Sequence, residues 1–375
     1  MSRVILPVDR LEELWRPGKA RVGALLHGAS VTSRWESTLT VLERLEAVGM
    51  LELRALFGPQ HGFLATTQDN MVEWEGYEHS RLGIPVHSLY GEHREPTGEM
   101  LEGLDVLFVD LVDVGARYYT FIWTLFLCMK ACAVAGVRVV VCDRPNPLNG
   151  VTVEGVPQGE DYLSFVGLWP MAHRHGMTIG EVAMLFQREV FPNCDLEVLP
   201  MQGWERTMWH DETGLPWVMP SPNMPTLDTA TVYPGMCLLE GTNVSEGRGT
   251  TRPFEMFGAP WVDAEALAAE LNGRDLRGVH FRACSFEPTF QKFAGEICHG
   301  AALHVVDRAR YEPVLTGTVV IQVLWRGYDA FAWKEPPYEY ETEKLPIEIL
   351  AGHPVDVFFG ERGDVRHSFA DLAGG

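Results

Sequence analysis

The sequence has little positive charge for its length, and this restricts the partners it can have. Its 375 residues include 30 Lys and Arg against 51 Asp and Glu, so the formal net charge is −21 at pH 7. No run rich in Lys or Arg offsets this charge locally. Because binding to nucleic-acid phosphates requires a basic surface, we exclude nucleic acid as a partner. A carboxylate on a substrate would have to be met by individual arginines inside a cleft.

The chain also lacks the cysteine pattern of a disulfide framework. Its seven cysteines lie scattered, mostly within apolar segments, and an odd number without close spacing predicts reduced thiols. Cys128 and Cys132 are four residues apart in a helical pattern, a spacing that metal ligands also show. We favour the interpretation that the two cysteines are small apolar side chains on one buried helix face.

A secretory start and a membrane-spanning run are missing as well. The N-terminal segment MSRVILPVDRLEELWRPG has no basic start followed by an apolar core of secretory length. The longest apolar stretch, residues 118–141, is interrupted by Lys130 and Arg138 and broken at Gly136. This pattern predicts a buried helix followed by a buried strand rather than a transmembrane helix. We therefore expect a cytoplasmic protein without membrane contact.

Several signatures of cofactor and nucleophile sites are absent. No G-x-G-x-x-G follows the first predicted strand, and the glycine-rich segment 241–251 lacks the Gly-Lys-Ser/Thr ending of a phosphate loop. H-E-x-x-H and G-x-S-x-G are also missing. These absences argue against dinucleotide binding, metal chemistry and a serine nucleophile, so we expect no cofactor and no metal.

The first half of the chain alternates short β-rich runs with helical patterns, which predicts βαβ units. We predict strands over residues 21–27, 51–57, 85–90, 105–110, 137–142 and 196–200. We predict helices over residues 36–48, 99–104, 120–135 and 178–190. The last of these begins with a capping box of Thr178 and Glu181. The predicted fold class is α/β, with a doubly wound, mostly parallel sheet.

The second half changes in composition. Over residues 203–257 Pro, Gly, Asn, Thr and Trp dominate and regular periodicity is lost, which predicts a long functional loop region. Order then resumes, with predicted helices over residues 264–271 and 314–326 and predicted strands over residues 279–286 and 301–306. We predict two domains, an α/β domain over residues 1–235 and a smaller α+β domain over residues 236–375.

Polar side chains recur at the ends of the predicted strands. They are Gln60 and His61, Glu92, Asp110 and Asp113, and Asp143. In open parallel sheets the binding crevice lies outside the carboxyl ends of the strands. The recurrence therefore predicts the rim of an active site.

Seven short strings concentrate Asn, His, Arg and Glu beside Gly and Pro. They are GPQHG (58–62), SLYGEHREPT (88–97), DLVDVGARYYT (110–120), DRPNPLNG (143–150), HRHGMT (173–178), SPNMPT (221–226) and EGTNVSEGRGTTRPFE (240–255). Such loops hold polar side chains on a stiff backbone, as sugar recognition requires. Together and in this order, from about residue 20 to the C-terminus, they resemble the exo-β-N-acetylmuramidases of the NamZ type, formerly a domain of unknown function.

The resemblance implies a Rossmann-like domain and a smaller ancillary domain, with the active-site cleft between them. It also implies a glycosidase that removes terminal N-acetylmuramic acid from the non-reducing end of peptidoglycan fragments, in cell-wall turnover or recycling. The implied partners are peptidoglycan-derived disaccharides or muropeptides. Two positions depart from the family's pattern, since Gln60 replaces a glutamate in Gly-Pro-Glu-His-Gly and Val112 replaces a glutamine in Asp-Ile-Gln-Asp. The string around Glu92 matches intact.

Hydrolysis of a glycoside needs an acid for the leaving oxygen and a second group for the anomeric carbon. We predict that Glu92, in a Gly-Glu-His turn, is the acid and that partial shielding raises its pKa. An ion pair with Arg94 on the surface is the structural alternative.

The second catalytic group is left open between several candidates. Asp113 and Glu246 are the candidate carboxylates, and His61 is a candidate to orient or assist one of them. Capping of the following helix is the alternative role of Asp113, and an ion pair with Arg248 is that of Glu246. The acetamido group of the substrate is a further candidate nucleophile.

The substrate-binding candidates follow from the chemistry of N-acetylmuramic acid. Its lactyl carboxylate suits the guanidinium fork of an arginine, and the candidates are, in order, Arg117, Arg248 and Arg144. Bracing of its own loop is the alternative role of Arg144. The other candidates for contact with the sugar are Tyr118, Asp143, Asn146, His175, Asn223 and Asn243.

Two other functions compete with glycoside hydrolysis. Gln60 favours a non-catalytic muropeptide-binding or sensor protein that keeps the cleft without the chemistry. A metal-dependent amidase or deacetylase would use His61, Asp110, Asp113 and His175.

Overall fold

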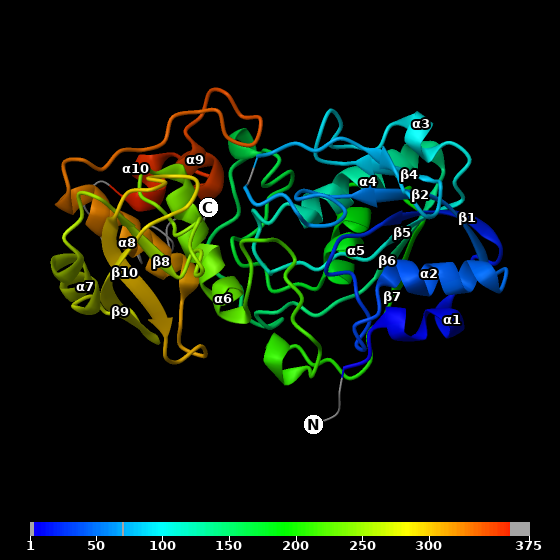
Figure 1. The fold of residues 1–375 in the computed structure, drawn as a ribbon, viewed down its shortest axis with the longest axis horizontal. Coiled ribbons are helices and arrows are strands. Elements are labelled where there is room, and N and C mark those ends of the chain that lie inside the picture. The colour runs from blue at the N-terminus through cyan, green and yellow to red at the C-terminus, as the bar shows by residue number, and fades with distance from the viewer. Residues whose placement is uncertain (1–3, 70, 361–375) are drawn as a thin grey trace. The chain divides into compact units, whose positions relative to one another are not determined.

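The chain forms two compact units in a computed structural model that describes residues 4–69 and 71–360 (Figure 1). Within these residues the first unit comprises 4–69, 71–115, 119–151 and 176–225. The second comprises 116–118, 152–175 and 226–360. The chain therefore passes between the units several times, whereas the sequence suggested a single boundary after residue 235.

The first unit is built on a seven-stranded sheet. Its strands are β1 (Ala20–Leu25), β2 (Leu51–Gly58), β3 (Tyr77–Glu78), β4 (Pro85–Ser88), β5 (Val106–Val109), β6 (Arg138–Cys142) and β7 (Leu196–Leu199). Their order is β3-β4-β2-β1-β5-β6-β7, and every neighbouring pair is parallel except β3 with β4. From β1 the sheet continues through β2 and β4 toward one edge, and from β5 it continues through β6 and β7 toward the other edge. The strand order therefore reverses between β1 and β5. The predicted α/β class and its doubly wound sheet are confirmed.

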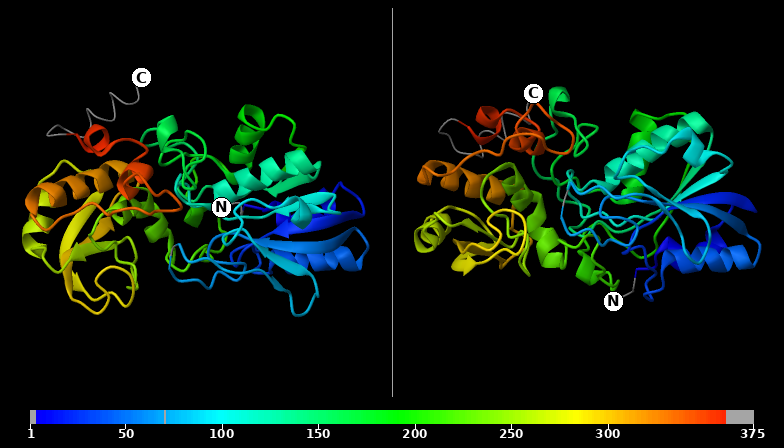
Figure 2. Two further views of the ribbon diagram at one scale, coloured as in Figure 1. Left: turned by 90° about the horizontal axis from the view of Figure 1, so that it is seen from above. Right: turned by 45° about the horizontal axis from the view of Figure 1, so that its top comes forward.

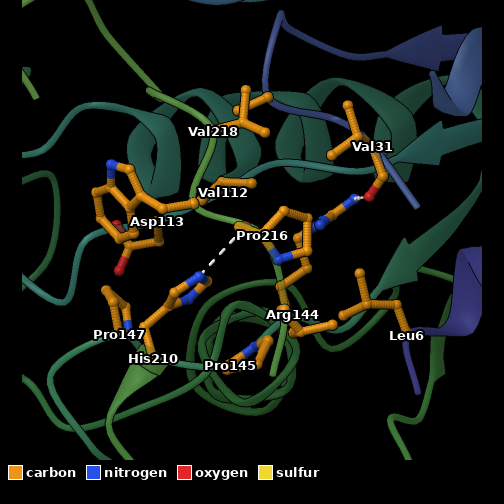
Figure 3. A pocket seen from close by; sticks show the side chains of 13 residues that line it. Leu6, Val31, Val112, Asp113, Arg144, Pro145, Pro147, His210, Pro216 and Val218 are labelled. Carbon is orange, nitrogen blue, oxygen red and sulfur yellow. Dashed lines mark hydrogen bonds between the residues drawn. The ribbon is translucent and has the colours of Figure 1, made fainter. Parts of the chain in front are cut away.

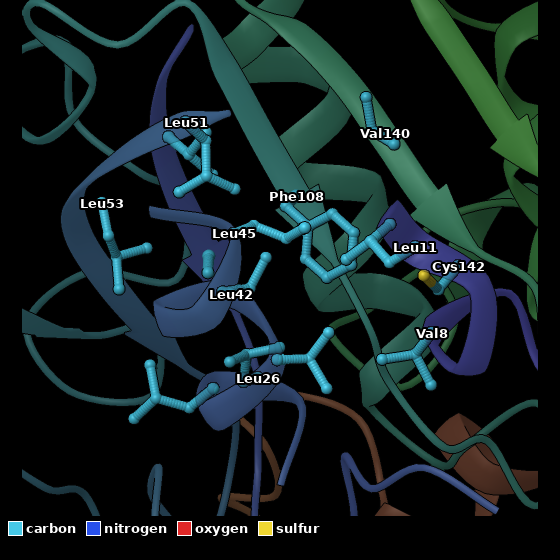
Figure 4. Close-up of a cluster of buried hydrophobic side chains, with 14 of the residues drawn as sticks. Val8, Leu11, Leu26, Leu42, Leu45, Leu51, Leu53, Phe108, Val140 and Cys142 are labelled. Carbon is cyan, nitrogen blue, oxygen red and sulfur yellow. The ribbon is translucent and has the colours of Figure 1, made fainter. Parts of the chain in front are cut away.

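Both faces of this sheet are buried, as is usual for parallel strands. Along β5, Val106 and Phe108 belong to a core cluster with Leu11 and Leu42, which come from the helices α1 (Leu11–Leu14) and α2 (Thr38–Ala47) (Figure 4). The intervening residues of β5 point to the other face and are fully buried too. There, helices α4 (Phe121–Ala135) and α5 (Ile179–Glu189) pack on β6.

Two local predictions about these helices are confirmed. The amide of Glu181 donates to the Thr178 hydroxyl at 3.2 Å and the amide of Thr178 donates to the Glu181 carboxylate at 3.0 Å, which completes the capping box of α5. Cys128 and Cys132 are both buried in α4, and all seven cysteines are free thiols. No helix in the described part of the chain is long and apolar enough to cross a membrane.

The second unit contains a three-stranded antiparallel sheet with several helices (Figure 2). The strands are β8 (Met256–Ala259), β9 (Val279–Phe286) and β10 (Cys298–Val305), in the order β8-β10-β9. The helices are α6 (Leu227–Met236), α7 (Ala264–Asn272), α8 (Pro313–Gly327), α9 (Pro346–Ala351) and α10 (Val355–Phe359). Short helices complete the two units: α3 (Gly98–Leu101) and the 3-10 helices η1 (Pro7–Arg10), η2 (Glu160–Tyr162), η3 (His210–Glu212) and η4 (Cys237–Gly241).

The prediction that residues 203–257 are irregular is wrong in part, because this segment contains α6. Residues 229–236 of α6 are all buried, so the helix has no polar face and its sequence lacks the amphipathic period that sequence reading depends on. Pro234 and Gly235 both lie inside the helix. Because both residue types are poor helix formers, they hide its helical character further.

Helices α6 and α8 approach each other at two glycines. A Cβ atom added to Gly235 would lie 1.8 Å from the carbonyl oxygen of Pro313. A Cβ atom added to Gly317 would lie 2.2 Å from the carbonyl oxygen of Gly235. The two backbones are therefore in direct contact, and any side chain at either position would force the helices apart.

We predict that Gly317→Ala lowers the free energy of unfolding by about 3 kcal/mol, because the added methyl meets backbone that cannot move aside cheaply. Gly327→Ala at the end of the same helix is the matched control, since nothing lies within 4 Å of its Cβ position. Removal of a glycine there leaves stability unchanged or raises it by up to about 1 kcal/mol. Denaturant titration of both variants checks this, and equal stabilities would contradict the close helix contact.

Candidate functional site

The polar residues predicted at strand ends do share one edge of the sheet. Strands β4, β2, β1, β5 and β6 are adjacent and parallel, so the loops that follow them leave from the same side. These loops carry, in that order, Glu92, Gln60 with His61, His27, Asp110 with Asp113, and Asp143 with Arg144. The reversal of strand order falls between β1 and β5, where open α/β sheets bind ligands.

A buried ion pair lies at this reversal. Both oxygens of the Asp110 carboxylate accept hydrogen bonds from Arg144, one from Nε and one from Nη2 at 2.7 Å. The exposed fractions of the two side chains are 0% and 8%. Arg144 also donates to the carbonyl oxygen of Val31 at 2.8 Å, and the Thr38 hydroxyl donates to Asp110 at 2.5 Å. The guanidinium therefore braces its surroundings, the alternative that the sequence left open for Arg144.

His27 fixes the loop that follows β5. Its Nε2 accepts a hydrogen bond from the amide of Val112 at 3.0 Å, and its ring packs edge-on against Phe121 with centroids 4.8 Å apart. Burial, together with the charge of Arg144, lowers the pKa of His27 to about 3. The imidazole is therefore neutral at physiological pH and acts as an acceptor for the backbone next to Asp113.

A pocket opens beside this loop, at the ends of β1, β5 and β6 (Figure 3). Ten of its 13 lining residues are apolar, and the three polar ones are Asp113, Arg144 and His210. The Asp113 side chain is buried, and its Oδ2 accepts a hydrogen bond from the amide of Gly115 at 2.7 Å. In the view of Figure 3, Asp113 and His210 lie at one end of the pocket and Leu6 at the other. The candidate carboxylate thus faces a largely apolar space.

Glu92 is the most accessible of the predicted catalytic groups. Its side chain is 89% exposed, and Nε2 of His93 lies 4.0 Å from its Oε1. The expected shielding of Glu92 is therefore not seen. Arg94, the alternative partner, instead lies over the Tyr90 ring at 3.9 Å and pairs with Glu73 at 3.2 Å.

Gln60 and His61 are buried at the end of β2. The Thr120 hydroxyl donates to Oε1 of Gln60 at 2.6 Å. A glutamate in this position would accept the same hydrogen bond, so the change from the family pattern preserves this contact. His61 has a backbone φ of 69°, and its Nδ1 lies 2.8 Å from the carbonyl oxygen of Thr67.

Asp143 and Asn146 hold the segment that leads into α5. Asp143 accepts hydrogen bonds from the amides of Gly180 at 2.8 Å and Arg144 at 3.0 Å. Burial nevertheless raises its pKa to about 6. The Asn146 side chain donates to the carbonyl oxygen of Met177 and accepts from the amide of Leu148, both at 2.9 Å.

The other two asparagines also contact backbone. The side chain of Asn223, in the first unit, donates to the carbonyl oxygen of Gln68 at 2.5 Å. Asn243, in the second unit, donates to the carbonyl oxygen of Ala330 at 2.8 Å and accepts from the amide of Ala332 at 3.0 Å. Each of these two asparagines therefore helps to fix its loop through hydrogen bonds to the backbone.

Three further candidates lie in the second unit, where all are buried. The Arg117 guanidinium donates to Gln158 at 2.9 Å, to the carbonyl oxygen of Met171 at 3.2 Å and to that of Leu350. Burial lowers its pKa to about 10. The Tyr118 hydroxyl donates to the carbonyl oxygen of Pro234, and His175 is 4% exposed.

Glu246 and Arg248 belong to a buried charge cluster in the second unit. Arg248 donates to Glu240 at 2.6 Å, and its Nε lies 3.3 Å from Glu246. Lys292 donates to the other oxygen of Glu246 at 2.8 Å. Although burial opposes ionisation of Glu240, Arg248 holds its pKa below the usual value. Glu246 is thus paired with two cations, including the arginine that the sequence offered as its alternative partner.

Sequence reasoning missed His27 and the pocket residues His210 and Trp217. His27 ends a predicted strand, as the chosen candidates do, and the same signal would have included it. His210 and Trp217 come from the long irregular segment, where no local pattern indicates which residues meet the sheet edge. Among the described residues, no three His, Cys, Asp or Glu side chains are placed to hold a metal ion together.

We predict that Arg144→Met lowers the free energy of unfolding by about 3–5 kcal/mol, because it leaves the buried Asp110 carboxylate without its cationic partner. Arg21→Met is the matched control: Arg21 pairs with Asp105 at 2.8 Å, but the two side chains are 47% and 44% exposed. Its loss should cost far less, because solvent screens an exposed ion pair. Chemical denaturation compares the two, and a mild effect at Arg144 would contradict its bracing role.

Known proteins resemble the chain over most of its length. Models of the N-terminal and C-terminal domains of exo-β-N-acetylmuramidase NamZ match residues 22–228 and 231–356. Over 304 residues the chain is 46% identical to the peptidoglycan β-N-acetylmuramidase NamZ of Bacillus subtilis (strain 168), covering 81% of this chain and 72% of that protein.

Two crystal structures of DUF1343 family proteins from Bacteroides fragilis NCTC 9343 share the fold. Their TM-scores are 0.84 and 0.72 and their sequence identities 31% and 25%. Each match covers 99% of this chain, with 96% and 94% of the respective relatives. The sequence matches and the shared fold agree: the chain belongs to the NamZ family of exo-β-N-acetylmuramidases.

Proposed function

We propose that this protein is a glycosidase that releases N-acetylmuramic acid from the non-reducing end of peptidoglycan fragments. The observation that carries the proposal is the 46% identity to a peptidoglycan β-N-acetylmuramidase over 81% of the chain. The position of polar residues at the carboxyl edge of the sheet agrees with it, because this is where such folds bind ligands. The substrates are peptidoglycan-derived disaccharides or muropeptides.

Glu92 serves as the general acid in this proposal. Its exposed carboxyl group lies in the loop that follows β4, at the edge of the sheet that carries the other strand-end candidates. A bound sugar covers the carboxyl group and keeps water away from the proton transfer. Shielding is then supplied by the substrate and not by the free protein.

Asp113 is the better placed of the two candidate second carboxylates. It lines a pocket in the same unit as Glu92. Glu246 is 2% exposed and is neutralised by Lys292 and Arg248, so its charge already has partners. A carboxylate whose charge is already neutralised is a poorer partner for the positive charge that develops during the reaction.

The competing sensor function depends on Gln60. Its side chain keeps the hydrogen bond with Thr120 and leaves Glu92 untouched, so the substitution does not remove the proposed acid. Incubation with a disaccharide separates the two functions: a glycosidase releases free sugar, whereas a sensor binds the disaccharide and returns it intact.

We predict that the protein hydrolyses a chromogenic N-acetylmuramide and that Glu92→Gln lowers kcat by about 10²–10⁴-fold, because the amide cannot protonate the leaving oxygen. The exposed position makes the change nearly neutral for folding, within about 0.5 kcal/mol. Initial rates and thermal unfolding of the same samples check both parts.

Glu75→Gln is the matched control, since Glu75 is also an exposed glutamate in this region of the first unit. It should keep the parent rate. Near-normal turnover in Glu92→Gln would assign the acid to another residue, and a parent protein that cleaves no N-acetylmuramide at any pH would refute the proposed function.

A further inference from the structure

The pocket beside Asp113 is suited to a small substituent and not to a whole sugar ring. About 30 Å³ of it is open to the centres of solvent-sized groups, where a single water molecule needs about 10–15 Å³ by the same measure, so a group of a few heavy atoms fits. Its walls are mainly valine, proline and leucine side chains, with Trp217 among them. Apolar walls around so small a space favour a methyl group, because a hydroxyl would lose its hydrogen bonds there.

The polar residues of the pocket narrow the chemistry further. Arg144 is bound to Asp110 and to the carbonyl oxygen of Val31. Burial lowers the pKa of His210, so this ring is neutral at physiological pH, and its Nε2 lies 3.3 Å from the carbonyl oxygen of Pro216. Asp113 also lines the pocket, and its carboxylate can accept a hydrogen bond from a donor on the ligand.

Of the substituents on N-acetylmuramic acid, the acetamido group meets both requirements. Its methyl group suits the apolar walls, and its N–H can donate to the Asp113 carboxylate. The lactyl group is unsuitable, because its own carboxylate would be repelled by Asp113 at close range. The hydrogen bond from Gly115 leaves capacity for a further donor, since each carboxylate oxygen can accept more than one.

We propose that this pocket binds the acetamido group of the terminal N-acetylmuramoyl residue and that Asp113 orients it to act as the nucleophile. The inference rests on the proposed glycosidase function. Asp113 is suited to the task because its loop is held by the bond from Val112 to His27 and by the turn at Gly115, where φ is +78°. A fixed carboxylate on the N–H turns the acetamido oxygen toward the anomeric carbon.

The reaction then proceeds in two balanced steps. The acetamido oxygen forms a bond to C1 as the bond from C1 to the leaving oxygen breaks, and the proton of Glu92 passes to that oxygen. Asp113 stabilises the positive charge that develops on the acetamido nitrogen. Water next bonds to C1 as the C1–acetamido bond breaks, and the proton of that water returns to Glu92. The product keeps the anomeric configuration of the substrate.

Substrates with altered acyl groups test this inference. With chromogenic muramides bearing N-acetyl, N-fluoroacetyl and N-difluoroacetyl groups, kcat/KM should fall in steps, by about tenfold or more overall, because fluorine weakens the nucleophilic oxygen. Rates that do not respond to fluorination would overturn the inference while leaving the glycosidase intact. Absence of hydrolysis of the N-acetyl compound would instead refute the proposed function itself.

Enlarging the pocket gives an independent test that does not touch a carboxylate. One extra methylene in a tight apolar pocket reduces kcat/KM by about 10–200-fold, so the N-propionyl substrate should be poor for the parent protein. Val218→Ala should recover about tenfold of that loss by making room for the methylene. Val134→Ala, at an 87% exposed position on α4, is the matched control. It should leave the ratio of kcat/KM for the N-propionyl substrate to that for the N-acetyl substrate unchanged. An unchanged ratio in Val218→Ala would place the acyl group outside this pocket.

Discussion

The ion pair between Asp110 and Arg144 is the interaction on which the candidate site depends. It joins the end of β5 to the end of β6, and through the carbonyl oxygen of Val31 and the hydroxyl of Thr38 it also holds the loop after β1. Three loops at the reversal of strand order are therefore held by one fully buried carboxylate. A buried charge of this kind is tolerated because its partner and its hydrogen bonds compensate for lost hydration. The same bonds fix the positions of the loops that surround Asp113.

The chain uses its few interior arginines mainly on its own acceptors. Arg117 donates to carbonyl oxygens and Gln158, Arg144 to Asp110, and Arg248 to Glu240. A guanidinium group has five donors and cannot lose its charge inside a protein, so burial commits it to whatever acceptors surround it. A sequence that shows an arginine near glycine and proline cannot distinguish this structural use from ligand binding, because both place the residue in a stiff loop.

Much of the first unit could be predicted from sequence because its signals are local. Strands such as β5 are short apolar runs between polar residues, and the capping box of α5 is written in Thr178 and Glu181. Helix α6 could not be predicted in this way, since burial on all sides removes the period. The discontinuous second unit was hidden for a related reason: segments 116–118 and 152–175 join it through contacts with residues far along the chain. The strand-end pattern located the edge of the sheet, but it could not indicate the degree of exposure of Glu92 or the contribution of Trp217.

The histidine at the end of β1 has a consequence for how the protein responds to acid. The tautomer of His27 is fixed, because Nε2 accepts from Val112 and the ring proton must then reside on Nδ1. Because its pKa is about 3, the ring keeps this form throughout the range in which ordinary histidines titrate. An imidazole is normally the group that makes a loop sensitive to mild acid; here it acts as a permanent amide acceptor. An acid limb at mildly acidic pH in a rate profile of this protein therefore reports on groups other than His27, while the loop that His27 holds stays in place.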